Sequence, residues 1–402
     1  MMKFLKRYAL VVLAFFHLAV TRGVRGSFGV FYVALLQAFG WSRGATAGAV
    51  SLGIMVEGFS FPFVGVLTDR LGAHRTLILG GFFLTFGLAF SSTLSSLWEL
   101  YLWWGVVIAL GLAMTGMVPH VTILSRTFTE HRATVLGFAY TGMSFGAILL
   151  VPLAQIMIGS WGRPGAYLGL SGMTALLVLV PAWLFLPPLP QEFPKVKKER
   201  GGGTSDWTAG RALRNPVFWF LFGCRFISSV GTNIVNTHQI AHAVDIGYTK
   251  IFAAAIFGLM GFSGIFGKLF FGFLADHMRR EVVFTIVQGL ASLGVVALIF
   301  TQDTSLPVLL YSYALLYGLG AGTRALILSA LSADLFSGKN FGAIYGYFTL
   351  SVALGGGLGS WLGGALYDIR GNYFVAFLVA FICFALSIPA VLLSRRLPRP
   401  SD

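Results

Sequence analysis

Twelve long apolar segments constrain the fold of this chain more than any other feature. Each is close to the length of about 20 apolar residues that a helix needs to cross a bilayer. The segments cover roughly 8–36, 46–67, 76–96, 99–123, 133–159, 164–187, 216–241, 250–273, 281–301, 306–330, 341–366 and 373–394. The sequence therefore predicts an all-α membrane protein with twelve transmembrane helices.

Composition supports this class. Of the 402 residues, 56% are hydrophobic and only 10% are charged, whereas soluble domains carry about 25% charged residues. The 51 glycines suit closely packed membrane helices. The two cysteines, Cys224 and Cys383, lie inside apolar segments and predict packing roles rather than a disulfide.

The net charge of +14 is an orientation signal. Nineteen of the 28 Lys and Arg residues lie in one set of alternating loops and tails, and four lie in the other set. Lys and Arg are enriched on the cytoplasmic side of membrane proteins. We therefore expect a multi-pass protein with both termini in the cytoplasm, in a bacterial inner (plasma) membrane, and no nucleic-acid partner.

The chain is internally duplicated. A turn with Gly65, Asp69 and Arg70 recurs with Gly272 and Asp276, and the two Asp residues are 207 positions apart. Gly137 and Gly346 repeat at a similar offset, 209. The predicted organisation is an N-terminal six-helix bundle (1–190), a cytoplasmic linker (191–214) and a C-terminal six-helix bundle (215–402), related by pseudo-twofold symmetry.

The repeated turn resembles the signature loop of the major facilitator superfamily, and the resemblance covers essentially the whole chain. It implies two bundles that rock about a central site. The acidic residue of each loop can accept hydrogen bonds from a neighbouring helix N-terminus. The resemblance thus implies a cytoplasmic gate made of Gly65, Asp69, Arg70, Gly72, Arg75, Gly272, Asp276, Arg279 and Arg280. A plain basic turn would predict neither the Asp nor its recurrence.

Five cations lie within predicted spans: Arg22, Arg25, Arg225, Lys268 and Arg324. Burying each costs about 2.5–3.5 kcal/mol even on a lenient scale. Glu57 is the one clear acidic residue at similar depth, and it either pairs with Arg25 or acts in transport. One carboxylate cannot neutralise five cations, so the sequence predicts an anion from outside the chain.

Helical spacing extends the predicted substrate site. Arg225 and Asn236 are eleven residues apart, close to three full turns, and Tyr313, Tyr317 and Arg324 share a stripe. His120 joins this set because the resemblance places the fourth helix at the central cavity. Side chains able to carry a proton at this depth are Glu57, His17, His238 and Lys268.

A closer resemblance points to monocarboxylate and oxalate/formate-type porters. It rests on Gly26–Tyr32 followed by Gly40–Arg43, on Arg132–Gly137, and on Lys268. Lys268 falls where those porters have a carboxylate-binding Arg. This is a departure, because Lys is a point charge that can lose its proton when buried.

The favoured function is proton-coupled symport of a small organic anion, a monocarboxylate in the first place. The alternatives are exchange of two anions such as dicarboxylates, efflux of amphipathic compounds, and a non-transporting membrane sensor. We expect no enzyme, since the chain has no P-loop, HExxH motif or metal-ligand cluster. We also expect no metal site, no cofactor other than the coupling proton, and function as a monomer.

Overall fold

Helices make up all of the regular secondary structure that the computed structural model describes, which covers residues 2–41, 43–185, 207–336 and 338–394. Eleven of these helical elements are long and apolar enough to cross a membrane. The prediction of an all-α membrane protein is confirmed. Most of the predicted linker, residues 191–206, lies outside the described residues.

The N-terminal half contains α1 (Met2–Phe39), α2 (Arg43–Leu71), α3 (Ala73–Ser91), α4 (Leu97–Leu100), the π-helical η1 (Tyr101–Ile108), α5 (Ala109–Thr115), α6 (Met117–Thr127), α7 (Arg132–Thr174), the π-helical η2 (Ala175–Leu179) and α8 (Val180–Phe185). The C-terminal half contains α9 (Ala209–Leu213), α10 (Pro216–Asp245), α11 (Lys250–His277), α12 (Arg280–Phe300), α13 (Pro307–Ala321), α14 (Arg324–Leu335), α15 (Phe341–Arg370) and α16 (Phe374–Ser394).

The fifth and sixth predicted spans form one helical element, Arg132–Leu184, and this is why eleven elements replace twelve. The element is kinked at Gly162, whose φ of 67° lies in the left-handed region that glycine adopts readily. Pro164 follows two residues later, where its missing N–H suits the start of a new helix. A kink therefore stands where a loop was expected.

The chain forms two compact units. Unit 1 comprises Met1–Thr129, Ala139–Ala209 and Ser337–Leu350, and unit 2 comprises Glu130–Phe138, Gly210–Phe336 and Ser351–Asp402. Each unit is built mainly from one half of the sequence and takes the first residues of α7 or α15 from the other half. The division into bundles 1–190 and 215–402 stays a prediction.

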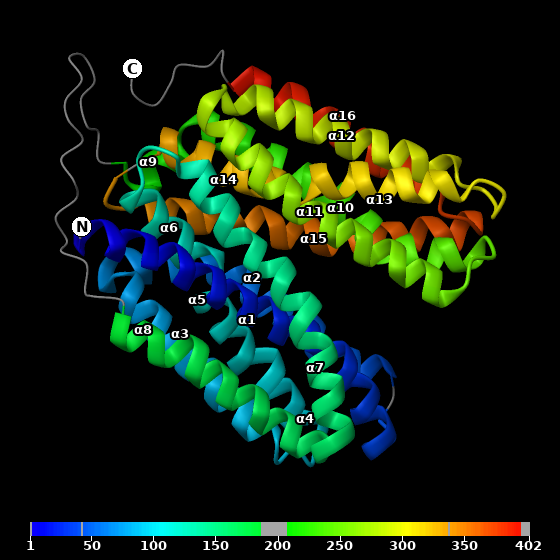
Figure 1. Ribbon diagram of the computed structural model, residues 1–402, viewed down its shortest axis with the longest axis horizontal. Helices are drawn as coiled ribbons and strands as arrows, with labels where there is room; N and C mark the ends of the chain where they lie inside the picture. Colours follow the sequence, from blue (N-terminus) through cyan, green and yellow to red (C-terminus); the bar gives the residue numbers. More distant parts are fainter. Residues whose placement is uncertain (1, 42, 186–206, 337, 395–402) are drawn as a thin grey trace. The chain divides into compact units, whose positions relative to one another are not determined.

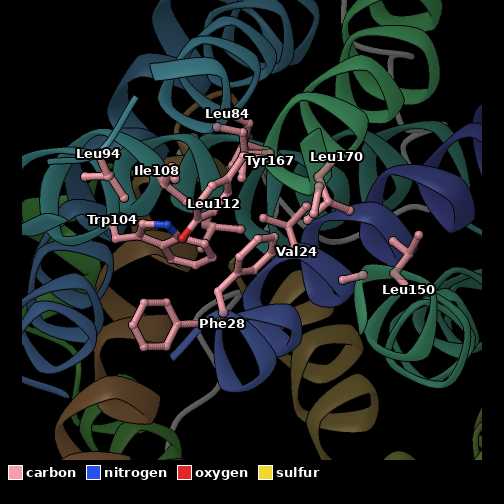
Figure 2. Close-up of a cluster of buried hydrophobic side chains, with 14 of the residues drawn as sticks. Val24, Phe28, Leu84, Leu94, Trp104, Ile108, Leu112, Leu150, Tyr167 and Leu170 are labelled. Carbon is pink, nitrogen blue, oxygen red and sulfur yellow. The ribbon is translucent and has the colours of Figure 1, made fainter. Parts of the chain in front are cut away.

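Aromatic side chains pack among leucines and other aliphatic side chains in the core of unit 1 (Figure 2). The rings of Phe31 and Tyr167 stack with their centroids 3.9 Å apart, and Trp104 meets Phe28 edge-on at 4.7 Å. These residues come from α1, α7 and η1 and are buried together with Leu112. Because these buried rings come from several helices, they determine which face of each helix points into the core.

The core of unit 2 lies among α10, α12, α13 and α16, which pack against one another and run side by side in Figure 1. Tyr313, Tyr317, Phe377 and Phe384 are almost completely buried there. The two tyrosines are also candidate site residues, so this core and the candidate site share side chains.

The repeated glycines allow backbones to approach closely, as predicted. A Cβ on Gly137 of α7 would lie 2.5 Å from the carbonyl oxygen of Lys268, and a Cβ on Gly346 of α15 would overlap the carbonyl of Phe61. A larger residue would separate these helices. The first contact lies in unit 2 and the second in unit 1.

Candidate functional site

The fourth and tenth spans are both interrupted near their middle. In unit 1, Gly116 separates α5 from α6 with φ −82° and ψ −149°, which is not helical. In unit 2, Gly322 and Thr323 separate α13 from α14, and both keep φ and ψ in the right-handed helical region. We call these the unit 1 break and the unit 2 break. Gly116 and Gly322 are 206 residues apart, so the breaks occupy matching places in the repeat. The non-helical angles at Gly116 interrupt the helix backbone of the fourth span.

Arg324 stands at the unit 2 break, as the first residue of α14. Its side chain is buried, and its guanidinium carbon lies 5.8 Å from the ring centroid of Phe384. Its Nη1 has no hydrogen-bond partner among the described residues. A buried guanidinium with an unused donor at a helix N-terminus is suited to an anionic ligand.

Two more buried cations belong to the same region of unit 2. A Cβ on Gly322 would lie 3.5 Å from Cε of Lys268, so the Lys268 side chain reaches the unit 2 break from α11. Arg225 on α10 is 3% exposed and lies within electrostatic range of Arg324. The structure thus brings together three of the five cations that the sequence singled out.

Three further predicted residues lie beside these cations on α10 and α13. Tyr317 donates a hydrogen bond to Oδ1 of Asn236 at 3.3 Å, and Tyr313 donates to Oε1 of Gln239. The two tyrosine rings stack at 5.3 Å. Both tyrosines hold α13 against α10, whereas Asn236 is exposed.

The two cations of α1 differ from those of unit 2. Nη1 of Arg25 lies 2.6 Å from Oε2 of Glu57 on α2, so the pairing that the sequence left open is formed. Arg22 is exposed. Glu57 thus neutralises one cation of unit 1, which leaves this part of the unit less positive than the unit 2 break.

Two candidate histidines, predicted separately, meet next to the unit 1 break. Nδ1 of His17 on α1 lies 3.2 Å from Nε2 of His120 on α6, and Nδ1 of His120 lies 2.7 Å from the carbonyl oxygen of Gly116. Both rings are buried, at 0% and 2% exposure. The third candidate, His238, belongs to unit 2, where its Nε2 lies 3.1 Å from the carbonyl of Ser360.

The repeated acidic turn forms one buried contact in each unit, and we call these contacts latches. In the unit 1 latch, Asp69 accepts hydrogen bonds from the backbone N–H groups of Gly342 and Ala343, at 2.9 and 2.6 Å. Arg126 donates to the same carboxylate and to the carbonyl oxygen of Lys339. A carboxylate thus caps the N-terminus of α15.

The unit 2 latch repeats this arrangement at the N-terminus of α7. Asp276 accepts hydrogen bonds from the N–H groups of Ala133 and Thr134, at 2.9 and 2.7 Å. Arg280 lies 3.7 Å from Asp276 and 2.7 Å from Asp334. Arg132 also pairs with Asp334, so four charged side chains form one network.

Sequence reasoning missed three members of the latches: Arg126, Arg132 and Asp334. It placed Arg126 and Arg132 among the basic loop residues, and it named Arg132 also as the start of the Arg132–Gly137 segment that resembles the porters. A signal was present, since Asp334 follows Arg126 by 208 residues, close to the repeat offset. Of the predicted gate residues, Arg70, Arg75 and Arg279 are exposed and lie at the surface beside the latches.

Comparison with known proteins agrees with this architecture. The family model described as Major Facilitator Superfamily matches residues 13–323 and 221–402. Monocarboxylate transporter 11 of Mus musculus is 30% identical over 89% of the chain and 80% of its own length. The chain belongs to the Major Facilitator Superfamily, in its monocarboxylate-transporter branch. It is therefore an integral membrane transporter and not an enzyme.

Other relatives support the same assignment. Monocarboxylate transporter 13 of Rattus norvegicus is 28% identical over 93% of the chain and 85% of its own length. The E. coli fucose:proton symporter FucP superposes with a TM-score of 0.74 at 19% identity, covering 96% of this chain and 98% of that one. The proton:xylose symporter XylE gives 0.76 at 12% identity, covering 98% and 96%. The two solved structures support the fold.

Proposed function

We propose that this transporter carries a small organic anion, in the first place a monocarboxylate, together with a proton. The observation that carries the proposal is the convergence of Arg225, Lys268 and Arg324 at the unit 2 break. A carboxylate offers two oxygens to such a set, and Arg324 has a donor available for one of them. The names of the relatives, monocarboxylate transporters 13 and 11, point to the same substrate class.

Energetics favour an anion over other ligands at this place. Placing three cations together inside a membrane protein is unfavourable without negative charge, and a cation cluster raises the local concentration of anions. A proton that enters with the anion offsets the charge carried against a negative-inside potential. Symport therefore needs less energy than uptake of the anion alone.

A thermal-unfolding screen tests the substrate class. A carboxylate at about 100 times its Kd stabilises a protein by about 2.7 kcal/mol, so lactate, pyruvate and acetate are compared with chloride on the purified wild type. We expect Arg324→Ala to lose the shift and Arg324→Lys to keep part of it, since Lys cannot form two parallel hydrogen bonds.

Arg214→Ala is the matched control, because it removes an exposed cation of the same unit. It should keep the full shift. If Arg324→Ala binds carboxylates as tightly as wild type does, then the unit 2 break is not the anion site. If none of the carboxylates stabilises the wild type, the substrate class itself is wrong.

Exchange of two anions is the second candidate. It is favoured by the number of cations at the unit 2 break, since three positive charges exceed the single charge of a monocarboxylate. In proteoliposomes, exchange would let an unlabelled dicarboxylate inside drive uptake of a labelled one with no dependence on a pH gradient. Symport predicts accumulation that follows the pH gradient.

We further propose that the latches form a gate that closes the transporter on its cytoplasmic side. We also propose that the protein lies in a bacterial inner membrane with both termini in the cytoplasm, and that it transports as a monomer. Each latch carboxylate holds a helix N-terminus by hydrogen bonds that can form in one conformation and break in another, which suits alternating access. A fluorescent reporter fused to the C-terminus, bright only in the cytoplasm, tests the orientation.

A further inference from the structure

We propose that His17 and His120 form the proton-binding site of this transporter, and that Nε2 of His17 is the atom that takes up the proton. The inference rests on the proposed proton symport and adds the location of the proton. It stands on the geometry of two buried rings at the unit 1 break, held on α1 and α6.

The hydrogen bonds fix which nitrogen carries each proton. The carbonyl oxygen of Gly116 can only accept, so Nδ1 of His120 carries a hydrogen and donates it over 2.7 Å. In neutral imidazole the other nitrogen is then an acceptor. Nε2 of His120 therefore accepts from Nδ1 of His17 over 3.2 Å. In turn, Nε2 of His17 has no hydrogen and a free electron pair.

The electron pair on Nε2 of His17 is the one position in these two rings that can still accept a proton. Nε2 of His17 is buried and has no hydrogen-bond partner among the described residues. A buried acceptor without a hydrogen bond lowers the free energy of unfolding. Selection for folding alone would therefore favour another residue at position 17. A proton that binds there forms a new N–H bond and gives an imidazolium at His17. The bond from His17 to His120 is kept and becomes charge-assisted.

The surroundings keep the new charge on His17 rather than on His120. His120 is the fourth residue of α6, where the positive end of the helix disfavours a cation. Passing the Nδ1 hydrogen to Nε2 of His120 would move the charge to this unfavourable place. Thr21 anchors the arrangement, because its hydroxyl donates to the carbonyl of His17 at 2.7 Å and lies 3.1 Å from the hydroxyl of Thr115.

The charged groups on the neighbouring elements leave His17 and His120 able to gain and lose a proton. On α1 itself, Arg22 is exposed and Arg25 is paired with Glu57 of α2. Asp69 of α2 and Arg126 of α6 pair with each other. The remaining ionisable group on α2 that the structure describes, Arg70, is exposed, and α5 and η2 contribute none. On α7, which packs against α1 where Gly142 meets Phe15, Tyr140 lies 3.3 Å from the hydroxyl of Tyr345, and Arg163 donates to the carbonyl oxygen of Leu94. On α3, which packs against α6, His74 and Arg75 lie in the first turn. The ring of His120 is thus the titratable group that lies against His17.

A proton on His17 is coupled to the anion through conformations of the helices that favour both ligands. A ligand shifts such an equilibrium by its difference in affinity between the conformations, so the proton and the anion must bind the same conformation best. Coupling of this kind is reciprocal, so the anion also favours the proton. Both rings are closed off from solvent in this structure, so the proton can exchange only after the helices move, as symport requires.

Transport by two histidine variants tests the site. His17→Asn places an amide N–H where Nδ1 stood and keeps the donor to His120, but it cannot take up a proton. His242→Gln is the matched control, because it removes another buried histidine and keeps a donor toward the carbonyl of Thr301. Purified proteins in proteoliposomes are assayed with labelled lactate in two modes: accumulation driven by a pH gradient, and exchange against unlabelled lactate at equal pH.

We expect His17→Asn to lose about 5- to 150-fold of the gradient-driven accumulation and to keep exchange, while His242→Gln keeps both. If wild type accumulates lactate with the pH gradient and His17→Asn does so equally well, the inference is overturned and the proposed function stands. If wild-type accumulation ignores the gradient, the symport proposal is wrong.

Nitrogen NMR of protein labelled at its histidines reads the site directly and does not depend on transport. We expect Nε2 of His17 to show the signal of an unprotonated nitrogen at high pH and to gain a proton as the pH falls, with the signal missing in His17→Asn and kept in His242→Gln. A His17 that carries hydrogen on Nε2 at every pH, or never takes up a proton between about pH 4 and 8, overturns the inference. Thermal unfolding confirms that each variant is folded, and His17→Gln replaces any variant that is not.

Discussion

The unit 1 break and the unit 2 break occupy matching places in the repeat and differ in backbone geometry and in chemistry. Gly116 has non-helical angles, whereas Gly322 and Thr323 keep right-handed helical angles. Both interrupt a span at matching glycines, Gly116 and Gly322. The unit 1 break gathers two neutral rings, His17 and His120, whereas the unit 2 break gathers cations, with Arg324 at its centre. Imidazole changes its charge near neutral pH and guanidinium does not.

This difference shows how a duplicated scaffold can serve two ligands. In each unit, the interrupted span places backbone groups and side chains inside the membrane-spanning region. Which ligand each break binds is then decided by a few side chains, and neither the helices nor their packing has to change. Under our proposals, the proton belongs to unit 1 and the anion to unit 2.

The largest expected effect comes from removing the unit 2 cations. The double substitution Arg225→Ala with Arg324→Ala should lower carboxylate affinity by about 2–5 kcal/mol, as truncation of buried charged partners does. Calorimetry with lactate and pyruvate measures the loss, and Arg214→Ala serves as the control. Titration of the His17–His120 pair should persist in the double variant. Affinity close to that of wild type would remove the contrast between the breaks.

The second largest effect is expected from substitutions in the latches, and the loss of stability should differ between the two latches. Asp69→Asn and Asp276→Asn each weaken charge-assisted bonds to a helix N-terminus, by about 1.5–3 kcal/mol of stability. We expect the larger loss for Asp69→Asn, because Arg126 then lacks its carboxylate, while Arg280 still has Asp334. Thermal unfolding in detergent gives the order. Equal losses would mean that the Arg partners contribute little.

The glycines of the two breaks should differ in what they tolerate. A Cβ on Gly116 would lie 2.7 Å from the carbonyl oxygen of Leu112, so Gly116→Ala should cost about 1–3 kcal/mol of stability. On Gly322 the nearest atoms lie 3.3 to 3.5 Å away and include Cε of Lys268. Gly322→Ala should therefore fold nearly normally and weaken anion binding. Unfolding curves and lactate binding separate the two outcomes, and the reverse order would contradict the geometry.

The smallest effect is expected from Lys268→Arg. If Lys268 acts as a fixed positive charge and the proton belongs to the histidines, Arg should support uptake driven by a pH gradient with only a slight loss. Lys268→Met removes the charge and should reduce uptake strongly. If uptake by Lys268→Arg did not depend on the pH gradient, Lys268 would be the proton site. Unit 2 would then bind both the proton and the anion.

The sequence was sufficient for the fold, because hydropathy and the repeat are local signals. The predicted spans agree with the helices except at the breaks within the fourth and tenth spans, and between 159 and 164, where the kink at Gly162 replaces a loop. The acidic turns were also predictable, since Asp69 and Asp276 recur at a fixed offset. Their helix N-terminal partners follow from the same repeat.

The pairings within the sites were not predictable, because they join residues far apart in the chain. His17 and His120 are 103 residues apart, and Arg132 and Asp334 are 202 residues apart. Periodicity places each residue on a helix face and says nothing of which helix faces it. The breaks have a weak local signal, as Pro119 follows Gly116 and Gly320 precedes Gly322, yet glycine is too frequent here to single them out.

The exchange of helix beginnings between the units has a consequence for how the protein is made. Unit 1 includes Ser337–Leu350, which the ribosome synthesises long after the rest of that unit. The early helices must therefore wait in the membrane with Asp69 lacking the N–H groups of Gly342 and Ala343. Completion of the first unit becomes a late step of biogenesis, and truncation before residue 342 leaves the first half without a cap for its buried carboxylate.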